Sequence, residues 1–216
     1  MGVPRSNILE HRIKASDLAS YYWCAEQSYW KLRGVTRKEK PTDVVGRKVH
    51  RALIKPPTED FEIEFFRKLK EFKPIYRASG RVRVYCGFDA VDLSSIPDNN
   101  SVRLLEFKTT ARESIPEYYL PAARFQLEIY YWAYKPIIER MGYVFPEEHF
   151  LEFHSSKDGE LIERIKVKMN EMEIARKIRE CLQSLGSGYG FSRPEQFKCD
   201  WCEPEYKEKC RLWQEA

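Results

Sequence analysis

Five stretches of the chain have the pattern of helices. In some of them apolar residues recur every three or four positions, and in others apolar residues occupy most of the segment. Each predicted helix can therefore bury at least one face. The predicted helices span residues 16–33, 42–53, 58–72, 121–141 and 171–185.

Residue types typical of helix ends support these boundaries. Ser16 and Thr42 are predicted N-caps, Asn170 and Glu173 resemble a capping box, and Gly186 is a predicted stop. The positions expected to be buried are Val45, Val49 and Leu53 in the second helix, and Ile174, Ile178, Leu182 and Leu185 in the last.

Two other regions have the composition of strands. Residues 82–109 contain two β-rich segments around a turn at 97–100, and residues 149–154 and 161–167 flank a Lys-Asp-Gly turn. Each region predicts a hairpin. The order of helices and hairpins predicts an α/β fold in which a mixed sheet is flanked by helices.

Length and composition indicate a globular protein. A chain of 216 residues with 43% hydrophobic residues can form one large domain, or one domain with a small lobe, around a substantial core. The net charge of +4 permits a polyanionic partner without requiring one, and 32% charged residues fit a thermophile. No apolar run has the length of a membrane span, and residues 1–6 lack the apolar stretch of a secretory signal. We therefore expect a soluble cytoplasmic protein.

The hairpin at 82–109 carries the strongest candidate chemistry. Glu106 and Lys108 are two residues apart on a strand, so both project to one face. Closing the hairpin brings Asp89 and Asp92 beside them. Two acids and a lysine can hold a hard divalent cation and offset charge on a phosphoryl group. An isolated Glu-x-Lys pair is more typical of a solvated strand face than of a metal site, so the pair alone does not predict a catalytic site.

Two predicted helices add polar residues. His50 follows Gly46 by four positions and adjoins an apolar stripe, and Gln126 and Tyr130 share a helix face. Taken alone, such a histidine is more typical of a structural residue, and such an aromatic-rich helix is more typical of a core.

The six cysteines are unevenly distributed. Three form a C-x₂-C-x₇-C group near the C-terminus, and three stand alone. The group is Cys199, Cys202 and Cys210, and the others are Cys24, Cys86 and Cys181. Cysteines of an intracellular protein are metal ligands or core residues more often than disulfides. Three thiolates in a short polar segment suit zinc or an iron-sulfur cluster with a fourth ligand from elsewhere, and spacing alone does not choose between these metals.

Taken together, four motifs resemble those of the RecB-like nucleases of the PD-(D/E)-x-K superfamily. In chain order they are Gly46-x-x-x-His50, Phe88-Asp89-Ala90-Val91-Asp92, Leu105-Glu106-Phe107-Lys108-Thr109 and Gln126-Leu127-Glu128-Ile129-Tyr130. One cysteine before this core and three after it resemble the iron-sulfur branch of the family. The layout of nearly the whole chain is similar to that of CRISPR-associated exonucleases of the Cas-four type.

The resemblance implies a restriction-endonuclease-like fold with a metal-dependent nuclease site. His50, Asp89 and Glu106 would hold one or two Mg²⁺ or Mn²⁺ ions, and Lys108 would orient the attacking water and stabilise the transition state. Gln126 and Tyr130 would support the site and touch DNA.

One motif departs from the family pattern. Gly87 precedes Asp89 by two residues, where the family places its glycine three residues before the first acid, so Asp92 is an alternative first acid. We favour Asp89, because the segment keeps the family's hydrophobic-Asp-x-hydrophobic-Asp pattern, in which the first Asp binds the metal.

The resemblance also implies that Cys24 joins Cys199, Cys202 and Cys210 around one iron-sulfur cluster. We expect the 4Fe-4S type, with 2Fe-2S or zinc as alternatives, and we expect Cys86 and Cys181 to be core residues. The predicted organisation is an N-terminal helical segment (1–41), a nuclease core (42–185) and a C-terminal cysteine region (186–216).

The expected function is a DNA exonuclease that prefers single-stranded ends and acts in CRISPR spacer acquisition beside the integrase complex. Three alternatives remain open. They are a RecB-like nuclease of repair, recombination or viral origin, a DNA-binding adaptor with vestigial catalysis, and a zinc-stapled structural protein.

Overall fold

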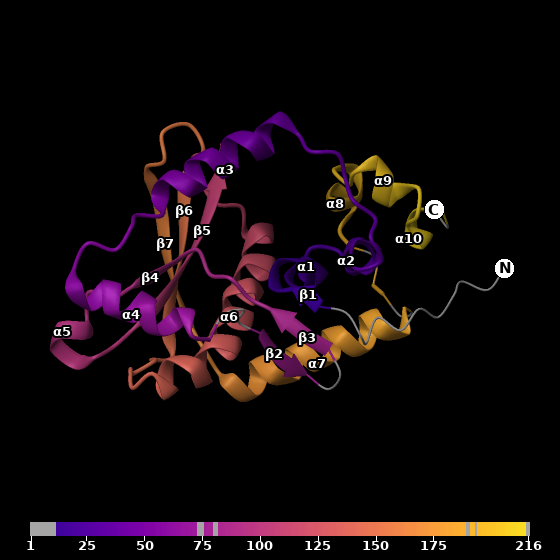
Figure 1. The fold of residues 1–216 in the computed structure, drawn as a ribbon. Helices are drawn as coiled ribbons and strands as arrows, with labels where there is room; N and C mark the ends of the chain where they lie inside the picture. Colours follow the sequence, from indigo (N-terminus) through magenta and orange to yellow (C-terminus); the bar gives the residue numbers. More distant parts are fainter. Residues whose placement is uncertain (1–11, 73–75, 80–81, 189–190, 193, 215–216) are drawn as a thin grey trace.

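The computed structural model describes residues 12–72, 76–79, 82–188, 191–192 and 194–214 (Figure 1). The first six residues, on which the prediction about a secretory signal rests, lie outside this part. Within it, no helix has both the length and the apolar character needed to cross a membrane.

A mixed four-stranded sheet forms one half of the molecule, as predicted. Its strands lie in the order β4 (Ala90–Asp92), β5 (Arg103–Thr110), β6 (Glu148–Ser155) and β7 (Leu161–Lys168). β5 runs antiparallel to β4 and parallel to β6, and β6 runs antiparallel to β7. The parallel pair is connected through α6 (Leu120–Arg140), so the fold is α/β with helices flanking a mixed sheet.

The two faces of this sheet carry different helices. Gly46 of α3 (Pro41–Leu53) lies so close to β5 that a Cβ there would stand 3.0 Å from Thr109 Oγ1. Gln126 of α6 hydrogen-bonds to Glu106 and Lys108, whose side chains alternate with Thr109 along β5. α3 therefore contacts one face of the sheet and α6 the other.

The predicted hairpin at 82–109 is only partly correct. β3 (Val82–Tyr85) belongs to a second, three-stranded sheet, between β1 (Arg12–Lys14) and β2 (Tyr76–Ser79). Between β3 and β4 the chain turns toward α6, where the Tyr134 hydroxyl donates to the carbonyl of Cys86 and the Phe88 ring lies 4.7 Å from that of Tyr134. These contacts replace strand pairing, so only β4 and β5 form the hairpin.

The predicted helix at 16–33 is also divided. α1 (Ala15–Ala19) and a 3₁₀ turn (Ser20–Tyr22) end before Cys24, whose backbone is extended, and α2 (Ala25–Lys31) begins after it. The N-cap is Lys14, not Ser16. The hydroxyls of Ser20 and Ser28 both donate to the carbonyl of Asp17, and such side-chain bonds compete with a continuous helix. Cys24 therefore lies in a break, not inside a helix.

The predicted buried stripe of α3 is wrong. No residue of α3 is buried, and Val45 is 49% exposed. Lys40, not Thr42, is the N-cap, with its backbone N–H bonded to Asp43. In Figure 1, α3 crosses one end of the large sheet, so most of its surface stays in solvent.

The remaining helices agree with the sequence more closely. α4 is Asp60–Lys70, α5 is a short helix in the predicted turn (Ile96–Asn99), and α6 begins after a 3₁₀ turn (Glu117–Tyr119). α7 (Glu171–Ser187) starts at Asn170, whose side chain accepts from the backbone N–H of Glu173, and its four predicted positions are buried. It ends at Gly188 rather than Gly186, because Gly188 has the left-handed φ of +68° and leaves no room for a side chain beside Tyr29.

Three short helices, α8 (Gln196–Asp200), α9 (Pro204–Lys207) and α10 (Arg211–Gln214), complete the C-terminus. They lie beside α2 in Figure 1. The Arg211 guanidinium hydrogen-bonds to Glu26, and Glu203 pairs with Lys40 at 2.8 Å. The two ends of the described chain are thereby joined. The predicted boundary after residue 185 falls inside α7, and the division into three segments stays a prediction.

Candidate active site and cysteine region

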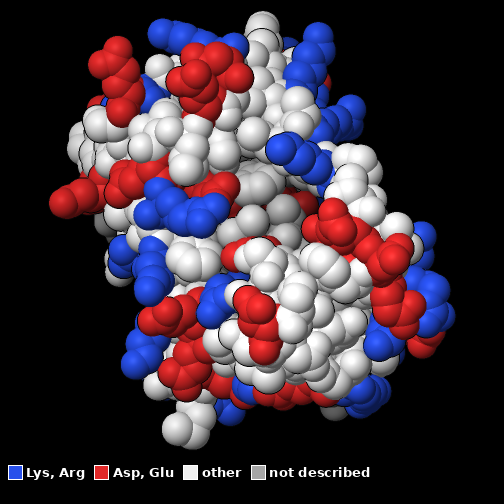
Figure 2. Space-filling model, turned by 90° about the vertical axis from the view of Figure 1, so that its left-hand side faces the viewer, with Lys and Arg blue, Asp and Glu red and all other residues white. Residues whose placement is uncertain are grey.

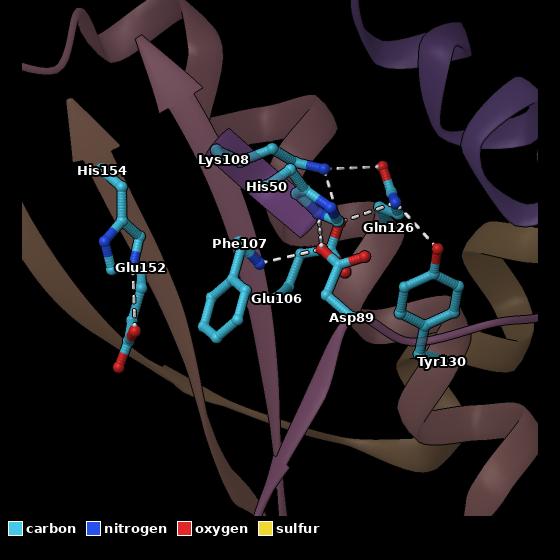
Figure 3. Close-up of polar contacts among 9 residues, drawn as sticks. All are labelled: His50, Asp89, Glu106, Phe107, Lys108, Gln126, Tyr130, Glu152 and His154. Atoms are coloured by element: carbon cyan, nitrogen blue, oxygen red, sulfur yellow. Dashed lines mark hydrogen bonds and ion pairs between the residues drawn. The ribbon is translucent and has the colours of Figure 1, made fainter. Parts of the chain in front are cut away.

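β5 presents Glu106 and Lys108 on one face, as strand alternation requires. The Lys108 Nζ atom lies 2.5 Å from Glu106 Oε1, and Glu106 is 0% exposed while Lys108 is half-buried. Figure 3 shows both side chains directed toward residues from α3, α6 and the segment before β4. Glu106 is therefore a buried acid with its own cationic partner.

α6 supplies the second pair of predicted residues. The Gln126 Oε1 atom accepts from Lys108 Nζ at 3.0 Å, and Gln126 Nε2 donates to Glu106 Oε1 at 2.7 Å and to the Tyr130 hydroxyl at 2.8 Å. The four-residue spacing on one helix face thus places both side chains at the site. Glu106, Lys108, Gln126 and Tyr130 form one hydrogen-bonded network (Figure 3).

His50 and Asp89 complete the cluster. His50 Nε2 lies 2.9 Å from Asp89 Oδ2, which also accepts from the backbone N–H of Phe107 at 2.9 Å. Gly46, one turn before His50, permits the close approach of α3 to β5 that this contact needs. The predicted site residues thus come together from four separate segments.

Asp92 takes a different position. Its Oδ1 atom accepts from the backbone N–H of Ser94 at 3.0 Å and from the Ser94 hydroxyl at 2.6 Å. This is an Asx-type turn that leads out of β4. Of the two candidate first acids, Asp89 is the one that bonds to His50 and to β5.

The two acids of the site differ in electrostatics. Burial raises the pKa of Glu106 to about 8, against the lowering effect of Lys108. Burial alone would also raise the pKa of Asp89, but the hydrogen bond from His50 and the charge of Lys108 together hold it below its usual value. The cluster thus holds one readily ionised acid and one acid whose ionisation is costly.

One oxygen of the cluster lacks a partner. Glu106 Oε2 is buried and has no hydrogen-bond partner among the described residues. Within that same part of the chain, no three His, Cys, Asp or Glu side chains already stand in a metal-holding arrangement. The acids instead bond to Lys108 through Glu106 Oε1 and to His50 through Asp89 Oδ2, so Glu106 Oε2 could take a cation without displacing either contact.

A cleft of about 260 Å³ opens beside this network. Lys108 and Gln126 are among the polar residues that line it, and Trp23, Tyr119 and Ile115 are among the apolar ones. The cleft therefore gives a solute access to Lys108 past aromatic side chains.

Glu152 and His154 form a second polar cluster that the sequence analysis did not single out. Glu152 bonds to His154 Nε2 at 3.0 Å and to Arg164 Nε at 2.7 Å, and both members of the β6 pair are buried. The Phe107 ring lies 5.3 Å from the His154 ring and 6.2 Å from that of His50 (Figure 3). The only signal in the sequence is a Glu-x-His pair at same-face strand spacing.

The four cysteines predicted to act together are contributed by the break before α2 and by the C-terminal helices. Burial raises the pKa of Cys24 to about 11, with contributions from Cys210 and Cys199. Burial also raises the pKa of Cys202 to about 12, with contributions from all three of the others. Neighbouring thiols thus contribute to both shifts, but in the described part of the chain no three cysteine side chains stand in a metal-holding arrangement.

The other two cysteines are core residues, as predicted. Cys86 and Cys181 are each 2% exposed, and burial raises the pKa of both to about 12. None of the six cysteines, all of which belong to the described part of the chain, forms a disulfide.

The surface charge does not form a single basic face in the view of Figure 2. Lys and Arg side chains alternate there with Asp and Glu side chains, and a hollow lies between them. A polyanion would therefore meet local basic positions on this face and not a broad positive field.

Comparison with known proteins found similarity to solved structures. No family model and no curated protein sequence matches this chain. The crystal structure of SSO0001, a Sulfolobus protein, is similar at 16% sequence identity with a TM-score of 0.49, over 97% of this chain and 89% of that chain.

Proposed function

We propose that this protein is a Mg²⁺- or Mn²⁺-dependent DNA exonuclease that hydrolyses phosphodiester bonds and prefers single-stranded ends. The observation that carries the proposal is the surroundings of Glu106. Its carboxylate is completely buried, and Oε2 has no hydrogen-bond partner in the described part of the chain. A buried carboxyl oxygen without a hydrogen-bond partner is costly, and burial raises the pKa of this group to about 8. A bound cation would favour the ionised form and give this oxygen a partner. The order of the four motifs, which resembles that of RecB-like nucleases, supports the same conclusion.

The donor set fits a hard divalent cation. His50, Asp89 and Glu106 would hold it, because two carboxylates and an imidazole supply oxygen and nitrogen ligands that suit Mg²⁺ and Mn²⁺. Once bound, such a cation lowers the pKa of water and stabilises negative charge on phosphoryl oxygens. Asp89 is ionised at neutral pH because its pKa is lowered, so it is ready to act as a ligand.

Lys108 would stabilise the charge that develops on the scissile phosphate. Its ammonium is held by Glu106 Oε1 and by Gln126 Oε1 before any substrate is present. A cation held in advance needs no reorganisation during the reaction. Tyr130 fixes the orientation of Gln126, since Nε2 donates to its hydroxyl and Oε1 is left to face Lys108. Gln126 and Tyr130 are thus positioning residues.

We also propose that Cys24, Cys199, Cys202 and Cys210 hold an iron-sulfur cluster of the 4Fe-4S type. Four cysteine thiolates are the ligand set of such a cluster, and 2Fe-2S and zinc are the alternatives that share it. The support for this proposal is the resemblance in cysteine placement, one before the nuclease motifs and three after them. The cluster would join the segment before α2 to the C-terminal helices. Closing so long a loop stabilises a fold by constraining the unfolded chain.

A cleavage assay tests the nuclease. Protein purified without oxygen is given end-labelled single-stranded DNA and the matching duplex, with Mg²⁺, Mn²⁺ or a chelator. We expect cleavage of the single strand with either metal and none with the chelator. Glu106→Gln should be inactive, and Glu139→Gln, a half-exposed glutamate at the far end of α6, should match the wild type. A wild type that binds DNA but leaves it uncut would instead support an adaptor role.

The cellular role that we propose is trimming of DNA before its insertion as a CRISPR spacer, with the integrase complex as partner. This part rests on the resemblance in sequence motifs. A strain that lacks the gene should acquire fewer new spacers, and the wild-type gene should restore acquisition while the Glu106→Gln gene should not. Normal acquisition in the deletion strain would favour a role in repair or recombination, and restoration by Glu106→Gln would favour the adaptor.

A further inference from the structure

A group of aromatic rings from three separate segments lies at the cleft. Trp23 precedes α2, Tyr118 and Tyr119 belong to the 3₁₀ turn before α6, and Phe197 and Trp201 belong to α8 and its end. We call these five residues the aromatic platform. The Trp23 and Tyr119 rings are stacked at 5.9 Å with an interplanar angle of 26°, and Tyr118 lies 4.8 Å from Phe197 and 6.1 Å from Trp201.

The platform is incompletely buried. Tyr119 is 42% and Trp201 51% exposed, and none of the five residues belongs to the buried core. Removing the surface of a Tyr, Phe or Trp ring from water contributes a large favourable free energy. A contiguous set of them left in solvent marks a binding surface more often than a defect of packing.

Two basic side chains lie over the platform. The Arg112 guanidinium is 5.9 Å from the Tyr118 ring and 5.4 Å from the Trp201 ring, and Lys198 Nζ is 5.4 Å from the Trp23 ring. Arg112 forms no ion pair with any carboxylate that the structure describes, whereas Lys198 also pairs with Glu195. Exposed rings combined with cations match the bases and phosphates of a single nucleic-acid strand.

The platform is continuous with the candidate active site. Trp23 and Tyr119 line the same cleft as Lys108 and Gln126. A strand whose bases stack on these rings would therefore bring its backbone toward Lys108. In a duplex the base faces are covered by their stacked neighbours, so the same rings have little to contact there.

We infer that the aromatic platform binds single-stranded nucleic acid by base stacking and directs it into the cleft. This inference rests on the proposed nuclease function and identifies what selects its substrate. The platform adjoins the cysteine region in the sequence. Trp23 precedes Cys24, and Phe197 and Trp201 lie on either side of Cys199.

Binding measured by fluorescence anisotropy tests the inference. The probe is labelled oligothymidine in buffer without divalent cations, so that binding is separated from cleavage. Trp201→Ala and Tyr119→Ala should each weaken binding at least about fivefold, as expected for a lost stacking contact. Trp201→Phe should keep most of the affinity. Tyr85→Ala, which removes an exposed tyrosine of β3, should bind like the wild type.

Salt dependence separates stacking from charge. Trp201→Ala should keep the wild-type slope of log affinity against log salt concentration, whereas Arg112→Gln should reduce that slope by about one unit if it contacts a phosphate. Affinity for a blunt duplex should change little in Trp201→Ala. Platform variants that bind oligothymidine like the wild type, or that lose duplex and single strand equally, would overturn the inference even where the wild type cleaves DNA. A wild type that binds oligothymidine through the platform but cleaves nothing would overturn only the nuclease.

Discussion

The imidazole of His50 lies 2.9 Å from the carboxylate of Asp89, although the two residues come from a helix and from the turn before a strand. Asp92 makes no comparable contact with the site in the part of the chain that the structure describes, and its carboxylate instead closes a turn with Ser94. The geometry thus distinguishes two acids that the sequence motif left as alternatives.

Asp89→Asn should abolish metal-dependent cleavage, and Asp92→Asn should leave most of it. The first change removes an ionised ligand, whereas the second keeps an amide oxygen that can close the same turn and should lower the free energy of unfolding by no more than about 1 kcal/mol. Initial cleavage rates and urea unfolding of both variants check this prediction. If Asp92→Asn were inactive and fully folded while Asp89→Asn cleaved normally, Asp92 would be the first acid.

Glu106→Gln should inactivate the enzyme at least about a hundredfold while leaving it folded. Glu106 is completely buried, not only directed at the site as the sequence suggested, so the isosteric change is cleaner than Glu106→Ala. Lys108→Ala should be equally inactive, because the cation beside the phosphate is lost. Folding is checked by circular dichroism, and a cleavage rate near that of the wild type in either variant would exclude the proposed mechanism.

The same variant gives a measurement that does not depend on activity. A carboxyl whose pKa is raised by folding binds its proton more tightly in the native state, so it lowers stability as pH rises from its unfolded value toward 8. Without metal, Glu106→Gln should therefore melt at or above the wild-type temperature at pH 8. Mn²⁺ should raise the melting temperature of the wild type but not of the variant. Equal stabilisation of both proteins would place the metal elsewhere.

The site was more predictable from the sequence than the fold around it. Alternation along a strand and four-residue spacing along a helix are local rules, and they correctly placed Glu106 with Lys108 and Gln126 with Tyr130. The division of the first hairpin strand was not predictable, because it depends on contacts of Cys86 and Phe88 with the distant Tyr134.

The exposure of α3 was not predicted for a similar reason. The spacing of its apolar residues is that of a buried helix, but the side that faces β5 is identified by the contacts of Gly46 and His50. The break at Cys24 depends on two serine hydroxyls that bond to one carbonyl. Tertiary contacts of this kind leave no periodic signal in the sequence.

His149 should make stability depend on pH below neutrality. It is completely buried, its Nδ1 accepts from the backbone N–H of Leu104, and burial lowers its pKa to about 3. A histidine whose pKa is lowered by folding contributes stability that is present above the unfolded pKa of about 6.5 and is lost as pH falls toward 3, by roughly 1.4 kcal/mol per unit.

His149→Asn tests this contribution, because an asparagine oxygen can accept the bond from Leu104. The variant should be less stable at pH 7, since it leaves a cavity, but its stability should fall less steeply between pH 6 and pH 4, measured by urea unfolding. His154→Asn, on the same strand, is the comparison. Parallel pH profiles for wild type and His149→Asn would show that folding does not lower the pKa of His149.

Cys24→Ser should lower the iron content and the melting temperature together, whereas Cys181→Ser should leave the iron content unchanged. The contrast follows from position. Cys24 lies in a helix break, and Cys210 and Cys199 contribute to the rise of its pKa, while Cys181 is buried in α7. Protein purified without oxygen should be brown and should lose its colour in the first variant but not in the second.

Iron and zinc contents measured by atomic emission identify the metal. Colourless wild-type protein with stoichiometric zinc would replace the cluster by a zinc site, and a Cys24→Ser protein with its full iron content would require a different fourth ligand.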